Sequence, residues 1–160
     1  MRTLELFAGA GGASLGLHRA GCTLVRGIEW DADAVATAQA AGHPTVQGDV
    51  RDPAMYADLG AIDLLWASPP CQAWSAANRH AGAKGEADTE RNGWPAALAA
   101  VRLVRPRWAI FENVKGSRDY IERNILPALR EMFAHVALWQ LNAQDFGLWQ
   151  SRTRLFVIGG

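Results

Sequence analysis

The sequence is poor in cysteine and has no long run of apolar residues. Its two cysteines, Cys22 and Cys71, are too few for a disulfide framework or a cysteine-based metal site. No apolar run approaches the roughly 20 residues that a membrane-spanning helix needs. The chain opens with a strand-like pattern and shows no secretory signal. These absences predict a cytoplasmic protein without a membrane anchor or a bound metal.

The charge balance offers no general attraction for polyanions. Lys and Arg number 16, as do Asp and Glu, so the formal net charge is zero. Affinity for nucleic acid comes mostly from cations placed opposite phosphates, so a nucleic-acid enzyme of this composition needs a local basic patch or a partner. A length of 160 residues with 49% hydrophobic residues suffices for one globular domain, and we expect a single domain over residues 1–160.

Strand-like and helix-like segments alternate along the chain, without internal repeats. Such alternation predicts an α/β domain with a mainly parallel sheet. The last two predicted strands are too close in sequence for a helical crossover, so we expect them to be antiparallel. Residues 68–91 lack periodicity and are predicted to form a long mobile loop. The predicted strands are 3–7, 23–29, 45–47, 62–67, 107–112, 135–141 and 154–158, and the predicted helices are 13–20, 32–41, 94–104 and 119–133.

A glycine-rich turn with the sequence FAGAGG, residues 7–12, joins the first predicted strand to the first helix. Glycine permits positive φ and a close approach of ligand to backbone. The spacing of Gly9, Gly11 and Gly12 does not complete the dinucleotide fingerprint, and no Gly-Lys-Ser/Thr follows as in a P-loop. The turn therefore favours a cofactor without phosphates.

Acidic and aromatic residues follow the next two strands. Glu29 ends the second strand, where a carboxylate can accept hydrogen bonds from both ribose hydroxyls. Trp30 could stack on adenine, and Asp49, after the third strand, could accept from the adenine amino group. Each residue alone is equally well explained as a strand-terminal cap or turn former. Together and in this order, at the carboxyl ends of strands, they favour an adenosyl cofactor.

Cys71 lies in a stiff turn, directly after Pro69 and Pro70, where the two fixed φ angles hold it in one orientation. A cysteine most often packs as a small hydrophobic residue, and Cys22 suits that interpretation. Cys71 suits it poorly, because it follows a buried strand at the edge of the sheet where ligands bind. A thiolate there could attack a pyrimidine ring.

Two further segments could assist such a thiolate. Glu112 ends the next predicted strand, where a buried carboxyl with a raised pKa could protonate ring N3; the alternative is that it caps the following helix. Arg152 and Arg154 are one residue apart near the last strand and so project to the same face. They could hold a base carbonyl or a phosphate, or form a solvated basic edge.

Taken in order, these segments resemble the cytosine-5 DNA methyltransferase family. Residues 6–12 with Ser14, Leu15 and Gly16 look like its cofactor loop, and Glu29, Trp30 and Asp49 look like its adenosine-binding residues. The run from Pro69 to Gln72, with Ser75, is similar to its catalytic-loop signature. Residues 112–114 and 150–154 complete the set. The order and spacing of these five segments, which span nearly the whole chain, make the resemblance specific.

The resemblance implies a fold, a cofactor and a reaction. The fold would be a Rossmann-like class I methyltransferase domain with a seven-stranded, mostly parallel sheet and an antiparallel last strand. Cys71 would add to carbon 6 of a cytosine flipped out of DNA while Glu112 protonates N3, and carbon 5 would accept a methyl group from S-adenosylmethionine. Arg154, with Arg152, would contact the base and the catalytic loop, which would close over it. Restriction-modification in a bacterium, or in a virus-infected one, would be the setting.

The resemblance also implies contacts for individual residues, by number in this sequence. Phe7 would pack against the adenine. The residues implied to bind the cofactor are Phe7, Ala8, Gly9, Gly11, Gly12, Glu29, Trp30, Asp49, Val50 and Pro69. The residues implied to bind the substrate are Pro70, Gln72, Ser75, Asn113 and Gln150.

The chain departs from the family pattern at single positions and in extent. Glu5 stands where Asp is usual, Trp74 where Phe is common, and Trp149 where Pro is usual. The family normally continues with a target-recognition domain and a final helix that packs beside the cofactor loop, and residues 1–160 include neither. We therefore consider a minimal enzyme with low specificity, one half of a split enzyme with a separate recognition subunit, a truncated chain, and a non-catalytic module.

Other activities stay open as alternatives. An amino-methyltransferase also has a Pro-Pro turn after this strand, but Ser68 and Cys71 match neither the residue it needs before the turn nor the one it needs after. RNA or a free nucleotide could be the substrate instead of DNA. A subunit that binds cofactor and stimulates a separate methyltransferase is a further alternative, against which the intact Cys71 argues.

Overall fold

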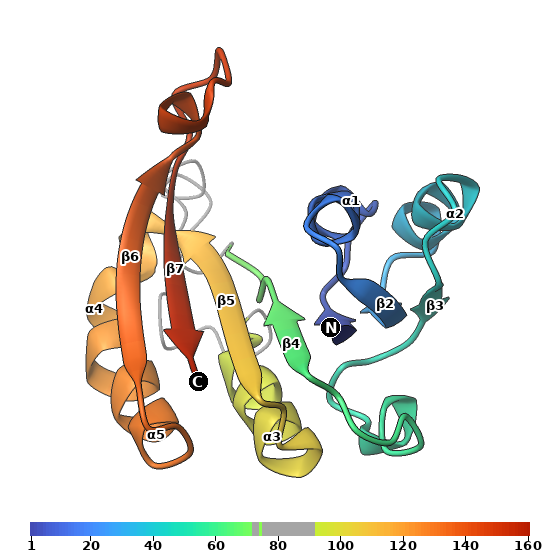
Figure 1. Cartoon of the computed structure of the whole chain (residues 1–160), viewed down its shortest axis with the longest axis horizontal. Helices are drawn as coiled ribbons and strands as arrows, with labels where there is room; N and C mark the ends of the chain where they lie inside the picture. Colours follow the sequence, from blue (N-terminus) through green and yellow to red (C-terminus); the bar gives the residue numbers. More distant parts are fainter. Residues whose placement is uncertain (72–73, 75–91) are drawn as a thin grey trace. The chain divides into compact units, whose positions relative to one another are not determined.

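The computed structural model describes residues 1–71, 74 and 92–160 (Figure 1). Its strands form a seven-stranded sheet in the order β3-β2-β1-β4-β5-β7-β6. The chain divides into two compact units: unit 1 comprises Met1–Ser68 and Ala96–Ala109, and unit 2 comprises Pro69–Pro95 and Ile110–Gly160. Most of the loop predicted for residues 68–91, including Gln72 and Ser75, lies outside the described residues. Among those described, no helix is long and apolar enough to cross a membrane.

The strands of unit 1 are all parallel. β1 pairs with β2 on one side and with β4 on the other, and β3 lies beyond β2. Leu4, Leu6, Leu65 and Ala67 are fully buried, as expected for parallel strands covered on both faces. The prediction of parallel strands is therefore confirmed for β1 (Arg2–Leu6), β2 (Thr23–Glu29), β3 (Thr45–Gln47) and β4 (Leu64–Ala67).

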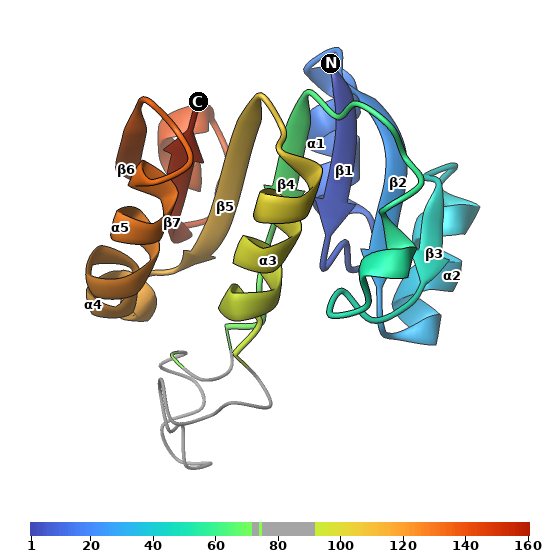
Figure 2. The same ribbon diagram turned by 90° about the horizontal axis from the view of Figure 1, so that it is seen from below.

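The helices of unit 1 are α1 (Gly12–Arg19), α2 (Ala32–Ala40) and most of α3 (Trp94–Val104). α1 and α3 lie on opposite faces of the sheet (Figure 2). The Asp31 carboxylate caps α2 by accepting a hydrogen bond of 2.8 Å from the Ala34 N–H. Gly42 adopts a φ of 82° just beyond the helix, a conformation that terminates helices and favours glycine.

Unit 2 contains most of β5 (Trp108–Val114), together with β6 (Val136–Asn142) and β7 (Thr153–Gly159). β6 and β7 are antiparallel, with Val136 opposite Gly159 and Asn142 opposite Thr153, which confirms the predicted orientation. Every second residue of β5 and β7 is buried. The core of the unit comprises Trp94, Phe111, Ile121, Ile125, Leu129, Leu155 and Val157.

The helix predicted at residues 119–133 is divided into shorter segments. α4 (Arg118–Tyr120) leads into a π-helical turn at Ile121–Ile125, and α5 (Leu126–Arg130) follows. Pro127 explains the wide turn, because it has no N–H to donate to the carbonyl of Arg123 and its ring crowds that carbonyl. The sequence predicted the helical character, but not this local widening.

Candidate active site

In unit 1, the glycine-rich turn adopts a backbone conformation that favours glycine. Gly9 has a φ of 55° and Gly11 a φ of 93°, and Phe7 also lies in the left-handed region at 58°. A Cβ on Gly11 would lie 2.6 Å from Cδ2 of His43, so a side chain has no room there. The Ala8 N–H donates a 3.0 Å hydrogen bond to the Ile28 carbonyl, which joins the turn to β2.

The carboxylate of Glu29 is fixed by two backbone amides. The Gly9 N–H donates to Oε2 over 2.7 Å, and the Asp31 N–H donates to Oε1 over 3.0 Å. Each carboxylate oxygen keeps capacity for a further hydrogen bond, so the group can still accept from ligand hydroxyls. The glycine turn and the end of β2, which were predicted separately, are thus brought together by the Gly9–Glu29 bond.

A second carboxyl group lies buried beneath the turn. Glu5 is 1% exposed, and its Oε2 accepts a 2.5 Å hydrogen bond from the hydroxyl of Ser14, which is fully buried in α1. Burial raises the pKa of Glu5 to about 7, with a smaller contribution from the charge of Glu29 and an opposing one from Ser14. The Glu5–Ser14 pair therefore links β1 to the first turn of α1, a role that the sequence did not predict.

The other predicted cofactor residues of unit 1 differ in their availability. Trp30 is 67% exposed, whereas Ala8 and Val50 are buried at 6% and 5%. The Asp49 carboxylate accepts from the Arg51 guanidinium at 2.9 Å, and that bond lowers the pKa of Asp49. Asp49 therefore stays a charged acceptor that already has a cationic partner.

In unit 2, a buried amide fixes the turn that precedes Cys71. Asn113 is 1% exposed, and its Nδ2 donates a 3.0 Å hydrogen bond to the Pro69 carbonyl. Its Oδ1 accepts from the Val114 N–H over 2.9 Å, which fixes the orientation of the amide. The end of β5 and the Pro69-Pro70-Cys71 turn are therefore held side by side, as their predicted positions implied. Cys71 itself is half-buried and carries a free thiol.

The residue that follows this turn packs against the segment after β5. The Trp74 N–H donates 3.0 Å to the Cys71 carbonyl, and the Trp74 ring lies 5.1 Å from that of Tyr120. A Cβ on Gly116 would overlap the Trp74 carbonyl oxygen. The Tyr120 hydroxyl in turn accepts from the Asn92 amide over 3.2 Å. Sequence reasoning missed these three supports, although a glycine two residues past β5 was a signal of close packing.

Glu112 and Arg154 form an ion pair across β5 and β7. The distance between Arg154 Nε and Glu112 Oε1 is 2.9 Å. The side chain of Glu112 is 21% exposed and that of Arg154 is 23% exposed. Burial raises the pKa of Glu112 above its ordinary value, and this effect outweighs the opposing charges of Arg154 and Arg152. A half-buried carboxyl that is held in one place and has a raised pKa is suited to act as a general acid.

The remaining predicted residues of this segment lie at or before the start of β7. Arg152 precedes the strand and is exposed, yet its charge still acts on Glu112. Gln150 is also exposed. Within the described parts of the chain, no group of three or more His, Cys, Asp or Glu side chains could hold a metal ion.

The chain is similar in sequence to known methyltransferases. It is 34% identical over 166 residues to the Type II methyltransferase M.HgiBI of Herpetosiphon aurantiacus, an alignment that covers 99% of this chain and 37% of that protein. It is 35% identical over 166 residues to the Type II methyltransferase M.AplI of Arthrospira platensis, covering 97% and 44%. The chain thus spans less than half the length of these two relatives.

A solved structure agrees in fold. An E. coli prophage protein described as a DNA modification methyltransferase superposes with a TM-score of 0.78 at 24% identity, covering 99% of this chain and 46% of that one. The fold is that of an S-adenosylmethionine-dependent methyltransferase. The family model for C-5 cytosine-specific DNA methylase matches residues 1–160. The chain belongs to this C-5 cytosine-specific DNA methylase family.

Proposed function

We propose that this chain carries the catalytic machinery that transfers a methyl group from S-adenosylmethionine to carbon 5 of cytosine in DNA. Family membership supports the reaction class. The observation that carries the assignment of roles is the arrangement of β5 in unit 2. Its Glu112 pairs with Arg154, and the adjacent Asn113 holds the turn that bears Cys71. A proton donor and a nucleophile are therefore positioned by neighbouring residues of one strand.

The residues of unit 1 fit an adenosyl cofactor. The fixed carboxylate of Glu29 offers acceptors to two ribose hydroxyls, and the exposed Trp30 offers a ring face to adenine. Gly9 and Gly11 supply a backbone without side chains at the turn, where a ligand can approach closely. S-adenosylmethionine, when bound, supplies an electrophilic methyl group.

Cys71 acts as the nucleophile in this proposal. Its thiolate adds to carbon 6 of cytosine, and the electron pair of the ring double bond moves toward N3. Glu112 delivers the proton that neutralises N3, so carbon 5 becomes nucleophilic and can accept the methyl group. Loss of the carbon 5 proton to solvent then restores the double bond and expels the Cys71 thiolate. The N3 proton returns to Glu112, so the product is neutral 5-methylcytosine and the enzyme regains both its thiolate and its acid.

The ion pair with Arg154 gives Glu112 a defined position without removing its tendency to hold a proton. The charges of Arg154 and Arg152 favour the carboxylate, whereas burial favours the neutral acid and dominates. Arg154 is the arginine held against Glu112, at 2.9 Å, and we assign it contact with the base as well. The exposed Arg152 is free to approach the nucleic-acid backbone.

The substrate in this proposal is DNA in which the target cytosine has left the duplex. The zero net charge favours modest affinity for DNA and a recognition partner that supplies sequence specificity. The setting that we propose is restriction-modification in a bacterial cytoplasm. RNA or a free nucleotide as substrate is the alternative, and a cofactor-binding subunit without catalysis is another.

Transfer of a labelled methyl group tests the proposal. Wild-type protein is incubated with methyl-labelled cofactor and duplex DNA, single-stranded DNA, RNA or dCMP, and the product is digested to nucleosides. We expect label on carbon 5 of cytosine in DNA, its loss in Cys71→Ser, and its retention in Cys22→Ala, because Cys22 is a buried residue of unit 1. Label on an exocyclic amine would contradict the mechanism. Label on RNA or dCMP alone would show that DNA is not the substrate.

A further inference from the structure

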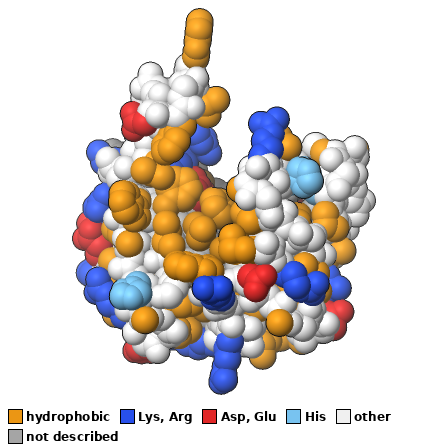
Figure 3. Space-filling model, viewed as in Figure 1, with side chains coloured by type: hydrophobic (Ala, Val, Ile, Leu, Met, Phe, Trp, Pro, Cys, Tyr) orange, Lys and Arg blue, Asp and Glu red, His pale blue; other side chains and the backbone are white. Residues whose placement is uncertain are grey.

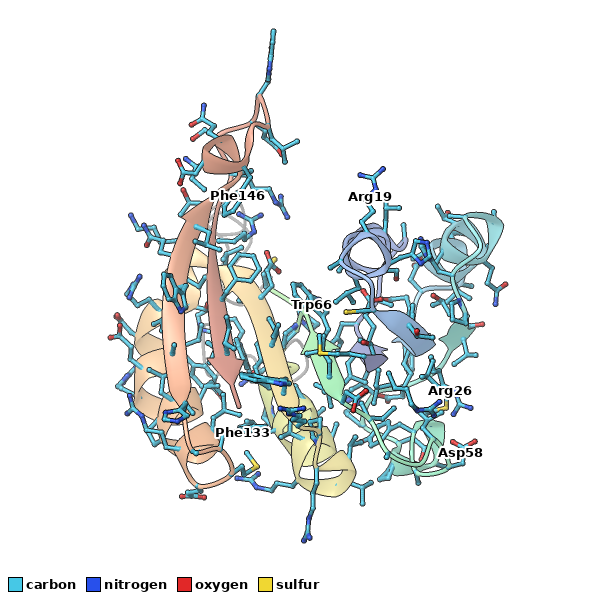
Figure 4. All side chains as sticks on the ribbon, viewed as in Figure 1. Arg19, Arg26, Asp58, Trp66, Phe133 and Phe146 are labelled. Atoms are coloured by element: carbon cyan, nitrogen blue, oxygen red, sulfur yellow. The ribbon has the colours of Figure 1, made fainter. Side chains whose placement is uncertain are left out.

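The connection between β6 and β7, residues 143–152, exposes large apolar side chains; we call it the β6–β7 tip. Phe146 is 68% exposed, Leu148 59% and Trp149 103%. Figure 4 labels Phe146 on this connection. Figure 3 shows hydrophobic atoms at the far end of this projection. Exposed apolar groups clustered within four residues are unfavourable in water, and such clusters commonly mark contact surfaces.

The tip is an ordered hairpin end, and the side chain of Asn142 holds the two sides of its base together. Asn142 Oδ1 accepts from the N–H groups of Gln144 and Arg152, at 3.3 and 3.0 Å. The Ala143 N–H donates to the Arg152 carbonyl over 3.0 Å, and the Leu148 N–H donates to the Ala143 carbonyl over 3.2 Å. Gly147 turns the chain with a φ of 83°. Trp149 is therefore presented by an ordered hairpin end, which lowers the entropic cost of using it in binding.

The tip projects from the edge of unit 2 where Glu112 lies. Arg154, the partner of Glu112, is the second residue of β7, which continues directly from the tip. Arg154 lies five positions after Trp149, a span of at most about 17 Å even when the chain is fully extended. That distance corresponds to roughly five base-pair steps of DNA. A strand whose base contacts Glu112 and Arg154 has its neighbouring nucleotides within reach of the tip.

The chemistry of the tip suits a nucleobase. Trp149 offers a fully exposed indole face, and base–aromatic stacking tolerates any base. Arg152 stands at the foot of the tip and, within the described residues, has no carboxylate within salt-bridge distance. Proteins hold unstacked strands by combining aromatic stacking on bases with basic side chains along the backbone. Trp149 and Arg152, three residues apart in the sequence, offer one group of each kind.

We propose that the β6–β7 tip is a nucleic-acid contact in which Trp149 stacks on a base close to the target cytosine and Arg152 faces a phosphate. The proposal rests on the function proposed above, since it places the substrate strand at the Glu112–Arg154 edge. The position of the tip argues for nucleic acid as its partner, because β7 leads directly from the tip to Arg154, the proposed contact of the base. The tip carries one cation, Arg152, and one carboxylate, Asp145, both exposed, and only Arg152 adjoins β7.

Binding and kinetics of matched tryptophan variants test this contact. The variants are Trp149→Ala, Trp149→Phe and, as control, Trp139→Ala, which removes another exposed tryptophan, on β6. Affinity for a fluorescent duplex is measured by anisotropy at several salt concentrations, together with KM and kcat for methyl transfer and with thermal unfolding. Trp149→Ala should raise the Kd and KM for DNA by about 5- to 100-fold, the loss of one stacked base, without changing the salt dependence.

The control variants decide how the result is interpreted. Trp149→Phe should stay within about threefold of wild type because it retains an aromatic face, and Trp139→Ala should leave the Kd unchanged. Methyl transfer to DNA with an unaltered Kd and KM in Trp149→Ala would overturn the contact while leaving the proposed function intact. An unaltered Kd together with a changed oligomeric state in sedimentation would assign the tip to protein association and also overturn it. Absence of methyl transfer in wild type would reject the proposed function separately.

Discussion

The two units of the molecule hold their functional groups in different ways. In unit 1, backbone amides hold the Glu29 carboxylate, and the turn that donates one of them requires glycine at Gly11. In unit 2, side chains do the holding: the Asn113 amide fixes the turn before Cys71, and the Arg154 guanidinium fixes Glu112. The difference matters because the backbone scaffold of unit 1 depends on the conformation of its turn, whereas the scaffold of unit 2 depends on two individual side chains, Asn113 and Arg154.

The units also differ in the state of their acids. Glu5 in unit 1 is fully buried under the glycine turn, with a pKa raised to about 7 and a serine as its hydrogen-bond partner. Glu112 in unit 2 is partly accessible and has a cationic partner. The buried acid can affect stability and the shape of the turn, whereas the accessible acid can exchange a proton with a substrate. We therefore expect substitutions in unit 1 to change cofactor affinity and stability, and those in unit 2 to change turnover.

The largest expected effect is that of Cys71→Ser. Loss of the nucleophile should lower methyl transfer by about 10³-fold or more, because covalent activation of the ring is lost. Cofactor affinity, measured by titration calorimetry, should stay within about twofold, since Cys71 is not among the residues proposed to bind the cofactor. A large loss of cofactor binding in Cys71→Ser would contradict the assignment of cofactor affinity to unit 1 and of turnover to unit 2.

Glu112→Gln should lower kcat by about 10²- to 10⁴-fold, because the amide cannot deliver a proton to the ring. Burial raises the pKa of Glu112, and the acid must be protonated to act. Wild-type kcat should therefore fall as pH rises through that pKa. The residual kcat of the variant, measured over the same pH range, should not show this fall. Glu122→Gln, which alters an exposed glutamate of the same unit, is the control and should keep the wild-type profile.

Glu5→Gln should change the pH dependence of stability. The native state holds the Glu5 proton more tightly than the unfolded chain, so its contribution is complete below pH 4.5 and is lost as pH rises through about 7. Relative to Glu5→Gln, the wild-type free energy of unfolding should fall by up to about 3 kcal/mol between about pH 4 and pH 8. Urea unfolding of both proteins, with Glu131→Gln as an exposed control, measures this. Parallel pH curves for wild type and Glu5→Gln would contradict the assignment.

Gly11→Ala should give the smallest of the four effects and tests the backbone scaffold of unit 1. The new Cβ would clash with the His43 ring, and the alanine backbone would have to adopt a φ of 93°. We therefore expect the free energy of unfolding to fall by about 1–3 kcal/mol. Cofactor affinity should fall with it. Gly16→Ala is the matched control, because its Cβ meets nothing within 4 Å in α1 and should stabilise by up to about 1 kcal/mol. Equal behaviour of the two variants would show that the turn does not require glycine.

The helices and strands could be predicted from the sequence because each depends on a local pattern of apolar residues and turn residues. The buried run that ends at Ala67 identified β4, and the short separation of the last two strands identified their antiparallel pairing. Boundaries shifted where side chains compete for the backbone. The strand expected from Ile62 begins at Leu64, and just before it the carboxylate of Asp63 accepts a hydrogen bond from the backbone N–H of Arg2.

The supports of the candidate site could not be predicted in the same way. The bond between Asn113 and Pro69 joins residues 44 positions apart, and the contact between Trp74 and Tyr120 is similarly remote. Local patterns carry no information about such pairs. The exposure of Trp149 could not be predicted from the sequence either, because an aromatic residue before a strand is more often expected to be buried. The chemical roles of Cys71, Glu112 and Arg154 were suggested by residue type and position, were made specific by the resemblance to a family, and stay predictions until they are measured.

Covalent trapping tests the central claim most directly. Duplex DNA that contains 5-fluorocytosine is incubated with the protein and S-adenosylmethionine, and intact-mass spectrometry with peptide mapping locates any adduct. Because fluorine cannot leave as a proton does, we expect a stable adduct on Cys71, present in Cys22→Ala and absent in Cys71→Ser. Binding of cofactor and DNA with no adduct, or an adduct at any residue other than Cys71, would contradict the account.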